Sequence, residues 1–236
     1  MNIFSKSMDP LSREYYLKNG INPYLAPLAM YLTQDIFLRG YFHETKILGS
    51  ENLPHEGPLI LAPVHRTRWD ALLLPYASGR RITGRDCRFM VTHNEMKGIQ
   101  GWFLQQFGCF SVDQSQPSLS SLRLAIDLLA SHEQLVMFPE GRICRVDKPM
   151  KIYNGPIRLA LIANRLGIPV RIVPIGIGYA HPFPLPQDKV VICFRAPITI
   201  TAKGPEIVKK LNRELITEMH SAELLARQEV GRPLQS

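Results

Sequence analysis

The sequence predicts an α/β protein in which a mixed, largely parallel sheet is flanked by helices and preceded by an N-terminal pair of helices. From about residue 46, short apolar runs alternate with segments of helical periodicity. Strands that alternate with helices build layered α/β folds. The first 44 residues differ, because their apolar side chains recur at helical spacing. We therefore expect a helical motif at 1–44 and an α/β domain with a C-terminal helix at 45–236.

The N-terminal segment predicts a short helix at 11–18 and a longer one whose start is marked by Pro23 and Pro27. Its apolar surface is wider than a single core contact needs, and charged residues interrupt it before it becomes long enough to span a bilayer. Two interpretations stay open. The pair forms an amphipathic hairpin in a membrane interface with aromatic rings at headgroup depth, or it packs on the core.

The α/β region contains short apolar runs that we expect to be buried strands, at 59–62, 88–91, 109–112, 135–138, 170–177 and 190–194. Helical periodicity falls between them, at 71–77, 99–107 and 119–131. A further helix opens at Pro156 and stops before Gly167, since proline favours a first turn and glycine a helix end. The tail at 205–227 predicts one long amphipathic helix.

Composition limits the classes of protein to consider. With 236 residues, 45% of them hydrophobic and 20% charged, the chain is long enough and apolar enough for a full core. A net charge of +8 favours an anionic partner, whether membrane lipid, nucleic acid or an acidic carrier protein. The four cysteines form no CxxC pair and no signal-peptide core is visible at the start, so we expect reduced thiols in an intracellular protein.

A histidine and an aspartate lie five positions apart where an expected strand gives way to a helix, at His65 and Asp70. A neutral imidazole can take a proton from a hydroxyl near neutral pH, and a carboxylate on its other nitrogen stabilises the imidazolium. Arg66 and Arg68 lie between them and offer guanidinium groups to an anion beside that hydroxyl. The simpler alternative is a buried histidine bonded to a backbone carbonyl, with an aspartate in the first turn of a helix.

Three later blocks follow His65-x4-Asp70 in order: GCFSVDQ at 108–114, FPEGR at 138–142 and VPIGI at 173–177. This set resembles the glycerolipid acyltransferase family of the lysophosphatidic acid acyltransferase type. The resemblance covers roughly residues 59–177. The N-terminal segment is also similar to the two-helix membrane-docking motif of bacterial members.

The resemblance implies transfer of a fatty acyl group from acyl carrier protein (acyl-ACP) or coenzyme A (acyl-CoA) to the free hydroxyl of lysophosphatidic acid, giving phosphatidic acid. The acceptor hydroxyl would be the nucleophile, so no serine elbow is needed, and the sequence contains no GxSxG. His65 would be the base and Asp70 its orienting partner. We expect no cofactor and no metal beyond the thioester co-substrate.

The resemblance also implies an acceptor site around the FPEG turn. Glu140 would organise it, and Gly141 would let the backbone approach the headgroup. The candidates for phosphate contact are cations near the blocks: Arg66, Arg68, Arg142, Arg145 and Lys151. Each of them has a simpler interpretation as a solvated surface charge.

The sequence departs from the family at Val64, at Gln114 and in the run from Arg142 to Arg145, where the family usually has asparagine or serine, arginine, and Thr-Arg-Ser-Arg. The acceptor therefore stays open between lysophosphatidic acid, another lysophospholipid and glycerol-3-phosphate. A non-catalytic basic protein that binds membrane or nucleic acid is the alternative of another class, although no aromatic-basic motif for nucleic acid is evident. We expect an intracellular protein, peripheral or monotopic at the cytoplasmic face of a membrane.

Overall fold

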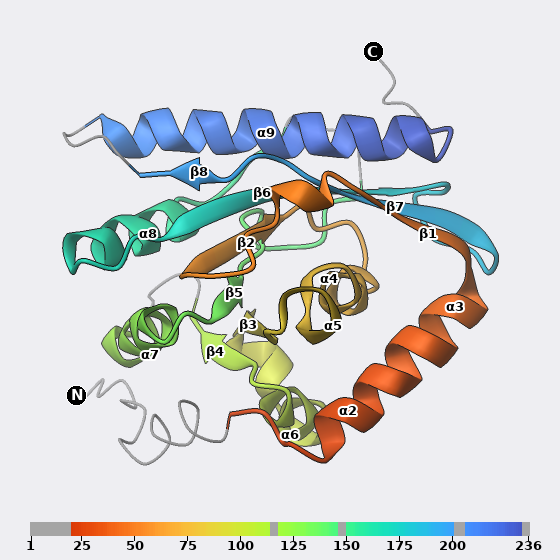
Figure 1. Ribbon diagram of the computed structural model, residues 1–236, viewed down its shortest axis with the longest axis horizontal. Helices are drawn as coiled ribbons and strands as arrows, with labels where there is room; N and C mark the ends of the chain where they lie inside the picture. Colours follow the sequence, from red (N-terminus) through yellow and green to blue (C-terminus); the bar gives the residue numbers. More distant parts are fainter. Residues whose placement is uncertain (1–19, 114–117, 146–149, 201–205, 233–236) are drawn as a thin grey trace, which may run out of the picture.

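The computed structural model describes residues 20–113, 118–145, 150–200 and 206–232. The helix expected at 11–18 and the residue Gln114 lie outside these ranges. The described strands form one sheet in the order β1-β7-β6-β2-β5-β3-β4, with β8 paired to β6 (Figure 1). Their bounds are β1 Phe42–Leu48, β2 Leu59–Pro63, β3 Cys87–Thr92, β4 Phe110–Val112, β5 Gln134–Val136, β6 Arg171–Tyr179, β7 Asp188–Phe194 and β8 Ile198–Thr199.

The sheet is mixed and largely parallel, as predicted. The pairs β1–β7, β2–β6, β2–β5, β3–β5 and β3–β4 are parallel, while β7 and β8 run antiparallel to β6. β1 was not among the expected strands. It is an edge strand whose middle carries exposed polar side chains, so it lacks a buried apolar run. β1 runs across the expected domain boundary between residues 44 and 45, and the N-terminal helical segment ends just before this strand, at Tyr41.

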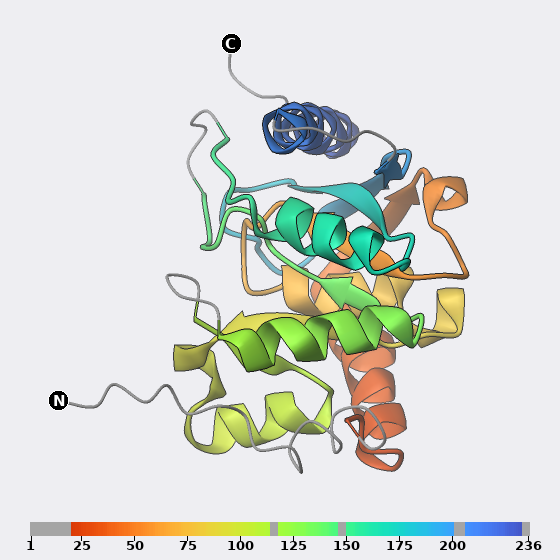
Figure 2. The same ribbon diagram turned by 90° about the vertical axis from the view of Figure 1, so that its left-hand side faces the viewer.

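The helices cover both faces of the sheet (Figures 1 and 2). α7, α8 and α9 lie over one face, and α4, α5 and the N-terminal helix lie over the other. Their bounds are α2 Leu25–Met30, the π-helical η1 Tyr31–Phe37, α3 Leu38–Tyr41, α4 Asp70–Ser78, α5 Arg80–Thr83, α6 Gly98–Gln106, α7 Leu119–Ala130, α8 Gly155–Arg165 and α9 Ile207–Glu229, with 3₁₀ turns η2 Ser50–Asn52 and η3 His93–Met96. Since the backbone stays right-handed helical at Tyr31 and Leu38, α2, η1 and α3 form one continuous helix.

Two glycines of β6 bring α9 unusually close to the sheet. A Cβ atom at Gly176 would lie 2.1 Å from the carbonyl carbon of Ala222, and one at Gly178 would lie 2.4 Å from that of Ala226. The glycines are therefore required by packing, since any side chain would push the helix away. The close approach carries Glu223 of α9, which is only 4% exposed, to the edge of the sheet where β2 ends.

No helix in the described part of the chain has an apolar stretch long enough to cross a lipid bilayer.

Candidate active site

The candidate site lies where β2, β5 and β6 end. β2 runs parallel to both neighbours, so the chain leaves all three strands at the same edge of the sheet. His65 lies in the loop after β2, the FPEG turn follows β5, and Tyr179 closes β6. Open α/β sheets bind ligands at this carboxyl edge.

His65 and Asp70 are in direct contact. Nδ1 of His65 lies 2.9 Å from Oδ2 of Asp70. The Phe138 ring stacks on the imidazole at a centroid distance of 4.0 Å, and the histidine side chain is 18% exposed. In the tautomer whose Nδ1–H donates to the carboxylate, Nε2 is a proton acceptor, which is the geometry that a general base with an orienting partner requires.

Asp70 is fully buried, and each of its oxygens has donors. Oδ2 also accepts from the backbone N–H of Arg66 at 2.6 Å and of Thr67 at 2.9 Å. Oδ1 accepts from the hydroxyl of Tyr179 at 2.5 Å and from that of Thr67 at 3.4 Å. These bonds compensate a carboxylate for the loss of water. They also fix the plane of the carboxylate that holds His65.

Tyr179 is one member of this site that the sequence analysis missed. Burial raises the pKa of its hydroxyl well above the ordinary value, and the charge of Asp70 raises it further. The phenol therefore stays protonated and keeps donating. A buried tyrosine at the end of an otherwise apolar strand needs a hydrogen-bond partner, and this was the available signal.

Arg66 does not face an incoming substrate. Its Nε and Nη2 donate to the two oxygens of Glu223, each at 2.6 Å, and its Nη1 donates to Glu140 at 2.8 Å. Burial disfavours the charge, but Glu223 and then Glu140 outweigh it and raise the pKa of Arg66 above its ordinary value. The guanidinium thus ties the β2 loop to both the FPEG turn and α9. Glu223 was also missed, because nothing in the local sequence links it to a residue so far away.

Glu140 turns back toward His65. Its Oε1 accepts the backbone N–H of His65 at 2.9 Å, and the carboxylate is buried. The turn itself depends on Gly141, whose φ of +69° is in the left-handed region and whose N–H donates to the carbonyl of Phe138 at 3.0 Å. Farther along, the N–H of Cys144 donates to the carbonyl of His65 at 2.8 Å. The FPEG segment therefore braces the His65 loop from both sides.

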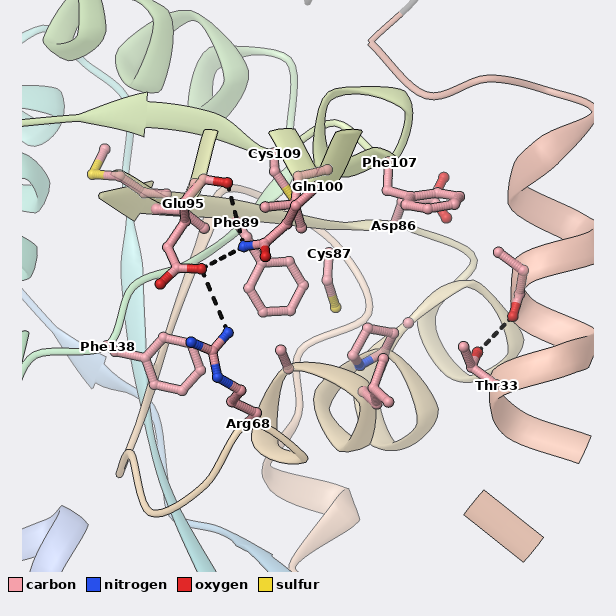
Figure 3. A pocket seen from close by; sticks show the side chains of 18 of the residues that line it. Thr33, Arg68, Asp86, Cys87, Phe89, Glu95, Gln100, Phe107, Cys109 and Phe138 are labelled. Atoms are coloured by element: carbon pink, nitrogen blue, oxygen red, sulfur yellow. Dashed lines mark hydrogen bonds and ion pairs between the residues drawn. The ribbon is translucent and has the colours of Figure 1, made fainter. Parts of the chain in front are cut away.

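The other predicted cations are exposed. Arg68 has 76% of its side chain exposed and lies 3.6 Å from Glu95 (Figure 3). Arg68, Gly141 and Arg142 line the same cavity as His65. Arg145 is not among the lining residues, and its guanidinium lies 5.0 Å from the ring of Phe183. Lys151 is exposed and does not line the cavity either.

The cavity that opens beside His65 has a volume of about 740 Å³ and extends between α2, η1, α4, α6 and β3. Its lining is mostly apolar, with Ala29, Met30, Leu72, Pro75, Phe89, Met90 and Leu104 among the contributors. Both Thr92 and Cys87, the two ends of β3, line it, so the cavity follows the strand for roughly 16 Å from the His65 edge toward the opposite edge. Such a space suits a long hydrocarbon chain.

The chain is similar to known proteins in both sequence and structure. A family model described as Acyltransferase matches residues 44–178. The chain is 28% identical over 197 residues to a 1-acyl-sn-glycerol-3-phosphate acyltransferase of Streptococcus pneumoniae, which covers 81% of this chain and 66% of the relative. It is 29% identical over 126 residues to the protein of the same name in Bacillus subtilis, covering 52% of this chain and 60% of the relative. Both alignments span less than two thirds of the relatives' own lengths.

The crystal structure of the 1-acyl-sn-glycerophosphate (LPA) acyltransferase PlsC from Thermotoga maritima aligns with a TM-score of 0.60 and 18% sequence identity. The alignment covers 94% of this chain and 81% of that one, and it confirms the fold class. The family match extends over β2, the His65 loop, the FPEG turn and most of β6. Because it spans more than half of the sequence and includes His65, Asp70 and the FPEG turn, the chain belongs to the Acyltransferase family.

Proposed function

We propose that this chain transfers a fatty acyl group from a thioester to the free hydroxyl of lysophosphatidic acid, giving phosphatidic acid. The observation that carries the proposal is the His65–Asp70 pair, at 2.9 Å, beside the mouth of an apolar cavity. The named activity of the two curated relatives supports the choice of acceptor.

The reaction needs one base and no covalent enzyme intermediate. Nε2 of His65 takes the proton of the acceptor hydroxyl as its oxygen attacks the thioester carbonyl. The ester C–O bond forms and the C–S bond breaks, and the imidazolium returns its proton to the leaving thiolate. Asp70 stabilises the imidazolium while it exists, without itself becoming protonated. No cofactor or metal takes part.

Two regions beside His65 would bind the two ends of the acceptor. The apolar cavity receives the hydrocarbon chain, because burying methylene groups there removes them from water. Arg68 and Arg142 line the mouth with His65, and they are the cations that we assign to the phosphate. Arg66 is assigned a positioning role instead, since Glu140 and Glu223 already occupy its donors.

The N-terminal helix would hold the protein at a membrane surface. It presents large apolar side chains to solvent, namely Tyr24, Leu28, Tyr31, Leu32, Ile36 and Phe37. Exposed apolar surface of this kind, on a chain with net charge +8, suits the interface of an anionic bilayer. We place the protein inside the cell, peripheral or monotopic at the cytoplasmic face, with acyl-ACP or acyl-CoA as donor.

Purified protein incubated with radiolabelled acyl-ACP or acyl-CoA and a panel of acceptors tests the proposal. Lysophosphatidic acid should give labelled phosphatidic acid together with free thiol. A clear preference for another lysophospholipid or for glycerol-3-phosphate would replace the acceptor and keep the chemistry. The altered run from Arg142 to Arg145 makes this the second candidate. Absence of thiol release with every acceptor would favour a non-catalytic membrane-binding protein.

A further inference from the structure

Helix α6 lines the cavity with one face and carries large exposed apolar side chains on another. Gln100 and Leu104 line the cavity on one side. On the other side Ile99 is 78% exposed, Trp102 51% and Phe103 47%. A surface helix of a globular protein normally buries its apolar stripe and turns a polar face outward. The exposed face of α6 is therefore only partly used in the packing of the described chain.

The continuous helix of α2 and η1 has the same two-faced arrangement. Ala26, Ala29, Met30 and Thr33 line the cavity, while Tyr24, Leu28, Tyr31 and Leu32 are exposed. Both helices thus form walls of one cavity and present apolar side chains on their outer surfaces. The outer apolar surfaces flank the space that we assign to a lipid chain.

Hydrogen bonds join the end of α6 to the start of α2. The backbone N–H of Asn22 donates to the carbonyl of Gln106 at 2.8 Å, and Nδ2 of Asn22 lies 3.2 Å from Oε1 of Gln106. Ile21 and Phe107 form an isolated antiparallel bridge at the same place. Both views show α6 beside the beginning of α2, away from α9 (Figures 1 and 2). The two exposed surfaces are therefore held together by the fold.

The chemistry of this surface matches a lipid bilayer. Contiguous exposed apolar side chains on a soluble domain mark a site of interaction. Tryptophan and tyrosine favour the boundary between headgroups and hydrocarbon. The exposed Lys97 directly precedes α6, so positive charge adjoins the apolar patch.

We propose that the α6 surface, defined as Ile99, Trp102 and Phe103, is a second membrane contact that acts together with α2 and η1. The two contacts seat the cavity against the bilayer, so that a lipid acceptor passes from the bilayer to His65 without crossing water. The delivery step rests on the proposed function. The membrane contact itself does not.

The chain contains two tryptophans, Trp69 and Trp102, which permits a direct test. In a Trp69→Phe protein, Trp102 is the source of all tryptophan fluorescence. On vesicles of phosphatidylglycerol and phosphatidylcholine in equal proportions, its emission should shift to the blue and be quenched by bromine-labelled lipid. If Trp69→Phe does not fold, the same signal follows from the difference between wild type and Trp102→Phe. Emission that stays quenched by aqueous acrylamide while the protein sediments with vesicles would overturn the proposal.

A pair of variants separates this contact from general hydrophobicity. Ile99→Gln with Phe103→Gln should weaken vesicle binding about tenfold or more, because two large side chains lose a buried site. The control is Leu166→Gln, which removes a 63%-exposed leucine at the end of α8, over the other face of the sheet, and should bind like wild type. Equal binding by the variant and the control would contradict the proposal. So would a dimer of the wild type that the variant dissociates, since a second copy would then cover the surface.

Activity measurements keep the two proposals distinguishable. The α6 variant should acylate detergent-dispersed acceptor at the wild-type rate and vesicle-embedded acceptor several-fold more slowly. If wild type acylates neither acceptor, the proposed function fails, while the fluorescence and binding results still decide the membrane contact. Equal loss of activity in detergent and in vesicles would contradict the delivery role.

Discussion

The hydroxyl of Tyr179 donates a 2.5 Å hydrogen bond to Oδ1 of Asp70, while Oδ2 of the same carboxylate contacts His65. Tyr179 thereby acts on the base through its partner. Tyr179→Phe should lower kcat roughly 10- to 100-fold, because a hydrogen bond to a charged group contributes about 1.5–3 kcal/mol.

The control for Tyr179→Phe is Tyr153→Phe, because Tyr153 is 64% exposed. Its kinetics should match wild type. If Tyr179→Phe lost stability but kept the wild-type kcat, Tyr179 would serve packing alone.

The buried ion pairs of Arg66 predict a large effect on stability. Glu223→Gln should lower the free energy of unfolding by about 3–5 kcal/mol, because it leaves a buried guanidinium short of compensating charge. The control is Glu218→Gln on the same helix, which removes the ion-pair partner of Arg195. That pair is 2.9 Å apart, and its side chains are 38% and 32% exposed. Its loss should lower the free energy of unfolding by about 1 kcal/mol or less. Urea denaturation measures both. Similar losses for the two variants would show that Arg66 is better solvated than its contacts indicate.

The two exposed cations at the cavity mouth should control affinity for the acceptor. Arg68→Ala and Arg142→Ala should each raise the KM for a phosphate-bearing acceptor about tenfold, as expected for loss of one charge-assisted contact. Arg145→Ala should leave KM near wild type, because Arg145 lies outside the cavity lining. Steady-state kinetics at fixed ionic strength provide the comparison. A rise confined to Arg145→Ala would relocate the phosphate site.

The depth of the cavity should select the length of the acceptor's hydrocarbon chain. Ala29→Phe adds volume to the inner face of the N-terminal helix and should shift the preference toward shorter chains. Leu28→Phe is its neighbour on the outer face, where the leucine is 53% exposed, and should leave the preference unchanged. Competition between acceptors of different chain lengths, with a single thioester donor, gives the ratio of kcat/KM values. An identical ratio for Ala29→Phe and wild type would mean that the chain lies elsewhere.

Two buried thiols predict a loss of stability at alkaline pH. Burial raises the pKa of Cys87 and of Cys109 to about 12. Unfolded chains release these protons near the ordinary thiol value, so the unfolded state binds fewer protons and stability falls as pH rises toward 12. The double variant Cys87→Ala with Cys109→Ala should show a shallower decline of unfolding free energy between pH 9 and 11 than wild type. Parallel slopes would contradict the burial of these thiols.

The sequence was sufficient for the elements with strong local patterns. Strands such as β2 and β6, and the helix that opens near Pro156, were predicted within a few residues, because continuous apolar runs and helix-end residues are local. β1 was not predicted, because an edge strand with exposed polar side chains has no continuous apolar run. The fold class did not depend on it.

The residues of the candidate site likewise include some with a local sequence signal and some without one. The spacing of His65 and Asp70 predicted their pairing, since a separation of five positions where a strand gives way to a helix can bring the two side chains together. Arg66 was expected at the phosphate, yet its partner Glu223 is 157 positions away and is delivered by the contact of α9 with Gly176. Partners fixed by tertiary packing leave no local pattern, so Tyr179 and Glu223 became visible only in three dimensions.

Loss of acyl transfer in His65→Ala is the most direct test of the central claim. Transfer of labelled acyl groups to lysophosphatidic acid should fall by about 10²- to 10⁴-fold, the usual contribution of a general base. The thermal unfolding midpoint should stay close to that of wild type, because the imidazole is at the rim of the cavity and 18% exposed. Wild-type turnover by the folded variant would contradict the role of His65 and with it the proposed mechanism.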